Sequence, residues 1–181
     1  MTDADVIRRS LADRAAFALL FDRHYPALHR FVRARVGAGL ADDFASEVFL
    51  TAFRRRSRYD LGRADARPWL YGIAVNVIRG HRRSELRRLR AYARAAADGR
   101  TGEVEPADAL DPELASALLG LGEDDRNLVQ LFAWAQLSYE ELAQALEIPV
   151  GTVRSRLSRA RAGLRTVLEP PPVPVAREEG A

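Results

Sequence analysis

The segment LSYEELAQALEIPVGTVRSRLSRARAGLR, residues 137–165, carries the strongest structural pattern in this sequence. Ser138 and Glu141 have the spacing of a capping box, in which each side chain bonds the backbone N–H of the other at a helix start. A short helix is predicted to follow, and Pro149 suits the first turn of a second one. Two short helices joined by a tight turn, the second of them basic, are typical of a helix-turn-helix.

The second of these helices is amphipathic when its residues are placed about 100° apart. Val153, Leu157, Ala160 and Leu164 fall on one face, which is predicted to pack on the rest of its domain. The other side carries hydroxyl and guanidinium groups, which suit base edges and phosphates in a major groove. A solvated surface helix would explain the arginines, but not the capping box, the turn and the apolar face together. The predicted DNA contacts are Thr152, Arg154, Ser155, Arg156, Ser158, Arg159 and Arg161.

Apolar residues recur with helical spacing along most of the chain, which predicts an all-α fold. Further helices are expected over about 14–36, with Pro26 as a kink or break, over about 40–55, and from Pro68 into an arginine-rich segment. Residues 91–110 have the composition of a flexible linker, and Asp111-Pro112 has the pattern of a helix start. We predict two small helical domains, 14–90 and 111–168, joined by linker 91–110 and followed by a disordered proline-rich tail, 169–181.

Composition narrows the classes of function. All 28 basic residues of the 181 are arginine, a planar donor suited to phosphate and guanine, and the net charge is only +3. The absence of cysteine excludes disulfides, thiolate metal sites and cysteine nucleophiles. We find no glycine-rich phosphate loop, no metal-spaced cluster and no nucleophile with a base, so neither an enzyme nor a cofactor or metal is expected. The charged N-terminal segment and the short apolar runs predict a cytoplasmic protein without membrane insertion.

The segment 137–165 closely resembles region 4 of bacterial RNA polymerase sigma factors of the extracytoplasmic-function (ECF) type. FDRHYPALHRFVRARVG (21–37) resembles their region 2.1, ADDFASEVFLTAFRR (41–55) region 2.2, and ARPWLYGIAVNVIRGHRR (66–83) regions 2.3 and 2.4. The motifs follow the family's order over residues 15–166, with a short linker in place of a full region 3. Phe44 and Ser46 depart from the family's region 2.2, which usually has an aliphatic residue and a glutamine there.

The resemblance implies a sigma factor that binds the β′ clamp and β flap of core RNA polymerase and directs it to promoters. It implies that the helix-turn-helix reads the minus-35 element as a duplex. In many members of the family an anti-sigma factor covers the polymerase-binding surfaces, so an anti-sigma factor is a further partner that the resemblance implies. The residues implied for core polymerase are Asp42, Asp43, Glu47 and Phe49.

The minus-10 element would be captured as a melted strand, which requires basic groups and surfaces for unstacked bases. In the family, the loop before region 2.3 holds a flipped base and sets much of the promoter preference. Trp69 is in register with Ile73 and Val77, so we expect it in the core. The residues implied for this element are Arg58, Tyr59, Arg63, Arg67, Asn76, Arg79, Arg82 and Arg83.

Two other classes of protein remain as alternatives. A regulator that binds duplex DNA without polymerase would explain residues 138–165, but not ADDFASEVFLTAF and PWLYGIAVN in the same chain and order. Such a regulator would usually need a dimer to contact two half-sites. A sigma-like protein that binds polymerase without initiating transcription would share all of these motifs.

Overall fold

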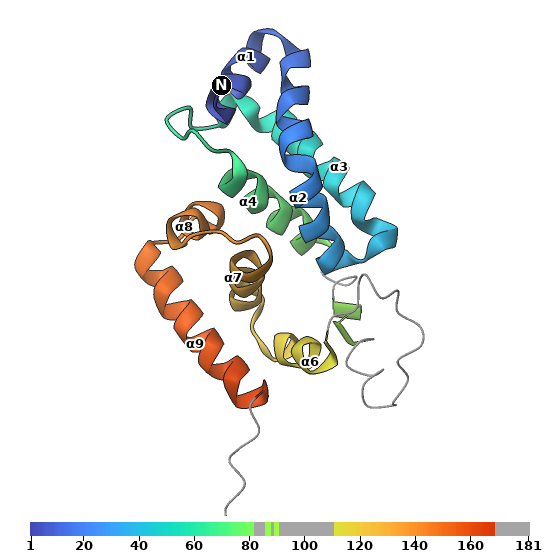
Figure 1. Cartoon of the computed structure of the whole chain (residues 1–181), viewed down its shortest axis with the longest axis vertical. Coiled ribbons are helices and arrows are strands. Elements are labelled where there is room, and N and C mark those ends of the chain that lie inside the picture. The colour runs from blue at the N-terminus through green and yellow to red at the C-terminus, as the bar shows by residue number, and fades with distance from the viewer. Residues whose placement is uncertain (82–85, 88, 91–110, 169–181) are drawn as a thin grey trace, which may run out of the picture.

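The computed structural model of the chain describes residues 1–81, 86–87, 89–90 and 111–168, and its elements are helices joined by turns (Figure 1). The first group comprises α1 (Asp3–Ala12), the 3-10 turn η1 (Arg14–Phe17), α2 (Ala18–Val36), α3 (Ala38–Arg55), the 3-10 turn η2 (Arg56–Arg58) and α4 (Arg67–Gly80). The second group comprises α6 (Pro112–Gly120), α7 (Glu123–Trp134), α8 (Tyr139–Leu146) and α9 (Val150–Leu168). The all-α prediction is confirmed, whereas the predicted linker and tail, 91–110 and 169–181, lie outside the described residues.

The first group is a bundle in which α2, α3 and α4 pack on one another around buried aliphatic and aromatic side chains. Pro26 lies inside α2, which continues unbroken across it. Helix α1 is an addition to the predicted domain, whose start we placed at residue 14. Val6 and Ile7 of α1 are fully buried in the same core. Thr2 caps this helix in a capping box with Asp5, a pattern that the sequence analysis did not use.

The second group contains the predicted helix-turn-helix. The Ser138 N–H donates to the Glu141 carboxylate at 2.7 Å, and the Glu141 N–H donates to Ser138 Oγ at 3.2 Å, so the capping box is confirmed. Val153, Leu157 and Ala160 are buried as predicted, while Leu164 is half-buried. These side chains fix the rotation of α9, because its apolar face packs on α6, α7 and α8.

Glu147 ends α8 in the left-handed conformation, with φ 54° and ψ 42°. A side chain at positive φ is strained, whereas glycine adopts this conformation freely. We expect Glu147→Gly to raise the free energy of unfolding by up to about 1 kcal/mol, since part of the gain is offset by the more flexible unfolded chain. Urea unfolding followed by circular dichroism measures this change. Glu140→Gly, inside the same helix, should lower the free energy of unfolding by about 0.5–1 kcal/mol, and equal effects of the two changes would contradict the prediction.

The two bundles pack against each other along α4 and α8, an arrangement that the sequence analysis did not predict (Figure 1). Gly72 of α4 lies against the backbone of Ala145, so closely that a Cβ on Gly72 would be 2.5 Å from the Ala145 carbonyl oxygen. The buried Arg35 of α2 also donates to the Asn127 side chain of α7 at 2.7 Å. One apolar cluster includes buried residues of both bundles. None of the described helices combines the length and apolar character needed to cross a membrane.

Candidate nucleic-acid interface

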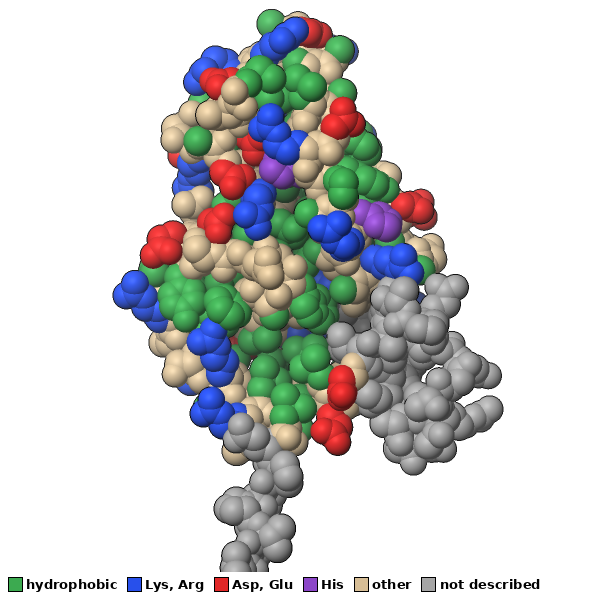
Figure 2. Space-filling model, viewed as in Figure 1, with side chains coloured by type: hydrophobic (Ala, Val, Ile, Leu, Met, Phe, Trp, Pro, Cys, Tyr) green, Lys and Arg blue, Asp and Glu red, His purple; other side chains and the backbone are tan. Residues whose placement is uncertain are grey.

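The outer side of α9 carries the seven residues that we predicted for duplex DNA. Arg154, Ser155, Ser158, Arg159 and Arg161 are exposed, and Thr152 and Arg156 are half-buried. Figure 2 shows basic side chains spaced along the edge of the molecule that α9 forms. The Arg161 guanidinium also lies 4.6 Å from the centre of the Phe132 ring and donates to the Tyr139 hydroxyl at 3.4 Å. The α9 surface therefore presents hydroxyl and guanidinium donors from a helix whose other face is anchored in the core.

The loop of residues 59–66 connects η2 to α4 and is highly structured. The Asp60 carboxylate accepts the Gly62 N–H at 3.0 Å and the Arg63 Nε–H at 3.1 Å. Tyr59 lies beneath the loop, 7% exposed, with its hydroxyl 2.7 Å from the Arg63 carbonyl oxygen and 3.1 Å from that of Asp65. Burial, together with the negative charges of Asp3 and Asp65, raises the pKa of Tyr59 to about 12, so the phenol remains a donor at neutral pH.

The residues predicted for the minus-10 strand are therefore not all equally accessible. The exposed ones are Arg58, Arg63, Asn76 and Arg79, whereas Arg67 is half-buried and Tyr59 supports the loop from inside. Arg82 and Arg83 lie outside the described residues.

An open groove of about 820 Å³ lies between this loop and the α8–α9 turn. Arg55, Arg58 and Arg63 line it on one side, and Gln144 and Pro149 on the other. Trp69 also lines the groove and is half-buried against Tyr59, with the two ring centres 5.0 Å apart. Trp69 thus packs on the core, as expected, and also presents an indole surface beside the basic side chains.

The surface of α2 and α3 holds the acids that we predicted for core polymerase. Asp42, Asp43 and Glu47 are exposed. Asp42 accepts a hydrogen bond of 3.0 Å from the Tyr25 hydroxyl, and its carboxylate also lies 3.0 Å from His29 Nε2. Asp42 therefore lies at the Tyr25 and His29 side of α2, whereas Glu47 lies 4.0 Å from His81, at the end of α4.

Phe49, the fourth residue predicted for core polymerase, is only 4% exposed. Its ring centre lies 4.8 Å from that of Phe21, which is itself 37% exposed. Leu50, the neighbour of Phe49, is 47% exposed. The accessible apolar groups beside the acids are therefore Phe21 and Leu50, which the sequence analysis missed because helical periodicity alone does not say which edge of a helix its neighbours leave uncovered.

Ion pairs of Asp124 link the two predicted DNA surfaces, and the pairs that Arg79 forms cross the bundle interface. Arg79 of α4 pairs with Glu123 and with Asp124, each at 3.0 Å. The Asp124 carboxylate also pairs with Arg156 of α9 at 3.5 Å. Arg67 donates to the Ala135 carbonyl oxygen at 2.9 Å. One acid of α7 thus contacts an arginine predicted for the minus-10 element and another predicted for the minus-35 element.

Each of the two bundles matches a protein-family model of its own. Residues 20–88 match the family model described as Sigma-70 region 2, and residues 112–164 match Sigma-70, region 4. The Pseudomonas aeruginosa RNA polymerase sigma-H factor is 31% identical over 91% of this chain and 92% of its own length. The Mycobacterium tuberculosis ECF RNA polymerase sigma factor SigM is 34% identical over 92% of this chain and 85% of its own length.

Two solved structures have a similar arrangement of helices. CnrH, in complex with the cytosolic domain of CnrY, has a TM-score of 0.68 and 26% identity and covers 92% of this chain and 96% of its own. The sigma factor RpoE of Bartonella quintana, in complex with the anti-sigma factor NepR, has a TM-score of 0.60 and 26% identity, and covers 84% of this chain and 96% of its own. The likeness therefore extends over both bundles.

Proposed function

This chain belongs to the sigma-70 family as an ECF-type sigma factor, which binds core RNA polymerase and directs promoter-specific initiation, and we propose here which of its surfaces perform each step. A sigma factor is not an enzyme, so the chemistry of these surfaces is recognition. We assign core polymerase and the minus-10 element to the first bundle, within 14–90, and the minus-35 element to the second, within 111–168. The observation that carries this assignment is the row of exposed hydrogen-bond donors on α9. These donors face outward because Val153, Leu157 and Ala160 are buried on the opposite face of the helix.

We propose that α9 lies in the major groove of the minus-35 duplex. Short Ser155 and Ser158 side chains at the centre of its outer face allow a close approach to base edges. Arg154, Arg159 and Arg161 extend farther, to guanines or to phosphates. Arg159 is the arginine at the centre of this face, so we expect it to contribute most to sequence preference.

We propose that the 59–66 loop and the adjoining groove receive the melted minus-10 strand. Exposed Arg58 and Arg63 supply positive charge for the phosphates, and the indole of Trp69 supplies a surface on which an unstacked base can lie. Tyr59 contributes indirectly, by supporting the loop from below.

We propose that the surface around Asp42, Asp43 and Glu47 binds the polymerase, with Phe21 and Leu50 as its apolar contacts. Interfaces commonly combine exposed apolar groups with a charged rim, which is the composition found here. Since RpoE is in complex with the anti-sigma factor NepR, and CnrH with the cytosolic domain of CnrY, we also propose an anti-sigma factor that covers part of this chain. We propose a cytoplasmic location for the protein.

We propose that the two bundles separate when the protein engages a promoter. Arg79 of the first bundle must exchange Glu123 and Asp124 of the second for DNA phosphates, and the groove beside Trp69 is bordered by α8. Arg156, predicted for the minus-35 element, pairs with the same Asp124 inside the second bundle. The two promoter elements lie far apart on DNA, whereas these arginines share one carboxylate in the packed chain. Binding to polymerase would supply the local concentration that two weak DNA contacts lack.

Run-off transcription tests the proposed function. We expect the purified protein, mixed with sigma-free core polymerase and a genomic fragment library, to give transcripts whose 5′ ends share a two-part upstream element. The protein without polymerase, and polymerase without the protein, are the controls. DNA binding by the protein alone without any transcript would favour a regulator, and polymerase binding without transcripts would favour a non-initiating relative.

A further inference from the structure

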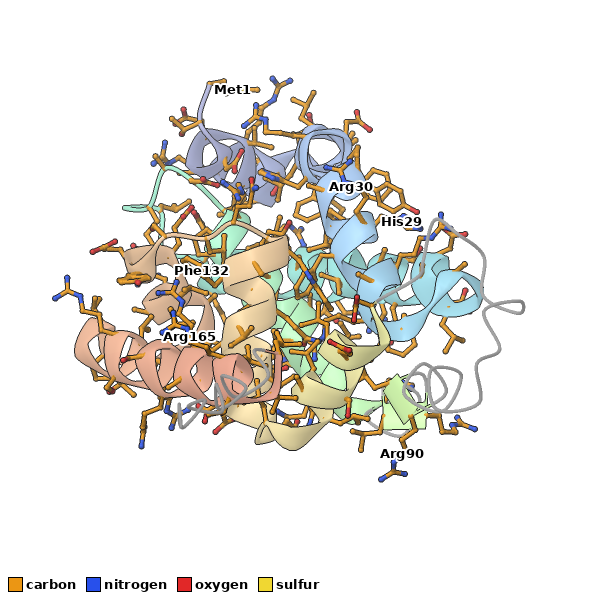
Figure 3. The ribbon with its side chains drawn as sticks, turned by 60° about the horizontal axis from the view of Figure 1, so that its bottom comes forward. Met1, His29, Arg30, Arg90, Phe132 and Arg165 are labelled. Atoms are coloured by element: carbon orange, nitrogen blue, oxygen red, sulfur yellow. The ribbon has the colours of Figure 1, made fainter. Side chains whose placement is uncertain are left out.

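Helix α1 lies before the residues that match the region 2 family model, which begin at 20, and it holds the 59–66 loop at both ends. At the loop's start, Arg56 of η2 donates to the Ser10 carbonyl oxygen at 3.3 Å. Its guanidinium also lies 3.9 Å from the centre of the Phe53 ring. Figure 3 labels Met1, which places the start of α1 at the first-bundle end of the molecule, away from Arg165 of α9.

At the loop's end, Asp3 makes two contacts with the loop backbone. The Asp3 N–H donates to the Ala64 carbonyl oxygen at 3.0 Å, and the Asp3 carboxylate accepts the Ala66 N–H at 2.9 Å. Ala66 is fully buried and directly precedes α4, so its position sets where the loop ends and the helix begins. One residue of α1 therefore fixes both the path of the loop and its junction with α4.

Further contacts hold the Asp3 side chain in place. Its carboxylate lies 2.7 Å from His24 Nε2 and also accepts from the Arg23 guanidinium, while Asp3 itself is 4% exposed. Burial alone would raise the pKa of Asp3, but the Ala66 N–H and the adjacent His24 outweigh it and hold the pKa below its usual value. The carboxylate is therefore charged at neutral pH, and charged acceptors form the stronger hydrogen bonds.

The same cluster has the donor types of a metal site, since ligand atoms of Asp3, His24 and Asp65 lie within 4.8 Å of one another. Both Asp3 carboxylate oxygens already accept from protein donors, Arg23 on one and Ala66 and His24 on the other. The Asp65 carboxylate accepts the Arg67 N–H at 2.8 Å. These contacts satisfy the acids with protein donors, so the cluster fits a structural clamp better than a metal site.

We propose that Asp3 is a positioning residue for promoter recognition, which clamps the 59–66 loop so that its exposed Arg63 meets the minus-10 strand in one geometry. This inference rests on the proposed function of the loop. A loop ordered in advance loses less conformational entropy on binding than a mobile one. It also discriminates better between bases, because a mobile loop can shift to accommodate the wrong one.

The test is transcription by the reconstituted holoenzyme from a promoter library with a randomised minus-10 element. The measured quantity is the ratio of transcripts from preferred and non-preferred sequences, within one reaction. Loss of folded protein lowers all transcripts by the same factor and leaves this ratio unchanged. We expect Asp3→Ala to lower the ratio about tenfold, the equivalent of roughly 1.4 kcal/mol. Asp3→Asn keeps an acceptor for Ala66 without the charge, so we expect a smaller fall.

Asp5→Ala is the matched control. It removes a carboxylate from the same helix, and the hydrogen bonds of that carboxylate are to Thr2 and Arg8 of the N-terminal segment, so the ratio should stay within about twofold of wild type. Hydrogen exchange of the Ala66 amide should accelerate in Asp3→Ala and not in Asp5→Ala, because only the first change removes its acceptor. Should Asp3→Ala fold too poorly to assay, Asp3→Asn provides the same comparison.

An unchanged ratio in the Asp3 variants would overturn the inference while the proposed function survived. Equal falls in the Asp3 and Asp5 variants would also overturn it, because the stability of α1 would then be responsible. If wild-type holoenzyme gave no starts at all, the proposed function would fail, and this inference with it.

Discussion

Alanine in place of Gly72 should force the two bundles apart. Its Cβ would lie 2.5 Å from the Ala145 carbonyl oxygen, well inside the contact distance of those atoms, and the obstacle is backbone, which cannot rotate away as a side chain can. Overpacking at a well-packed contact usually costs about 1–3 kcal/mol. That cost shifts the equilibrium between packed and separated bundles roughly 5- to 160-fold. Because α4 meets α8 there, and not the core of its own bundle, each bundle should remain folded.

The separation can be measured as a distance between two labels. The chain has no cysteine, so Arg8→Cys on α1 and Arg154→Cys on α9 provide two exposed labelling sites. We expect a longer and broader distance distribution in Gly72→Ala, with helical content by circular dichroism unchanged. Gly80→Ala is the control on the same helix, since a Cβ there meets nothing within 4 Å. A distance distribution identical to wild type would show that the α4–α8 contact tolerates the methyl group.

Separation should also change DNA binding by the protein without polymerase. Arg79 would be released from Glu123 and Asp124, and the groove beside Trp69 would lose the border that α8 provides. We expect Gly72→Ala to bind promoter DNA more tightly than wild type at the same salt concentration, and Gly80→Ala to bind equally. Weaker binding by Gly72→Ala would argue that the packed arrangement contributes to DNA recognition.

Arg159→Ala should strongly reduce use of the minus-35 element and leave polymerase binding intact. Arg159 is exposed on the outer face of α9, whereas the polymerase surface that we propose is on α2 and α3. A bidentate contact between arginine and guanine contributes about 1–3 kcal/mol of discrimination, so transcription from a minus-35-dependent promoter should fall roughly 5- to 160-fold. Arg156→Ala should give a smaller fall, because Arg156 is half-buried and already paired with Asp124.

The control for Arg159→Ala is a promoter with a scrambled minus-35 element. On that template the variant and the wild type should be equally active, because the contact that the change removes no longer exists. Arg14→Ala, an exposed arginine of η1, controls for the loss of one positive charge. An equal loss on both templates would place Arg159 outside the base-reading surface, and our orientation of α9 would be wrong.

The local patterns of this sequence specify its elements accurately. The Ser138–Glu141 capping box and the spacing of Val153, Leu157 and Ala160 predict both the start of the helix-turn-helix and the buried face of α9. Such patterns are readable because capping and helical periodicity depend on residues a few positions apart. Helix α1 was missed although Thr2 and Asp5 form the same kind of cap, since the helix itself has only a few large apolar residues.

The roles of individual aromatic residues were harder to predict. Tyr59 was predicted to contact the minus-10 strand, together with the arginines around it. It lies instead under the loop, with its hydroxyl hydrogen-bonded to two carbonyl oxygens. Phe21 and Phe49 each belong to a row of apolar residues that recur at helical spacing, yet Phe49 is buried and Phe21 is accessible. The difference depends on which neighbouring helix covers each ring, and the residue spacing within one helix does not show how its neighbours pack.

The sequence by itself determined the helices other than α1, the Ser138–Glu141 cap, the outward face of α9 and the family, because each of these depends on short-range spacing or on motifs in order. Only the tertiary structure decided that α4 and α8 pack through Gly72 and Ala145, that Asp124 links Arg79 to Arg156, and that Asp3 holds a loop some 60 residues away. These contacts join residues far apart in the chain. Their geometry depends on how whole helices dock, which the pattern within any one helix does not specify.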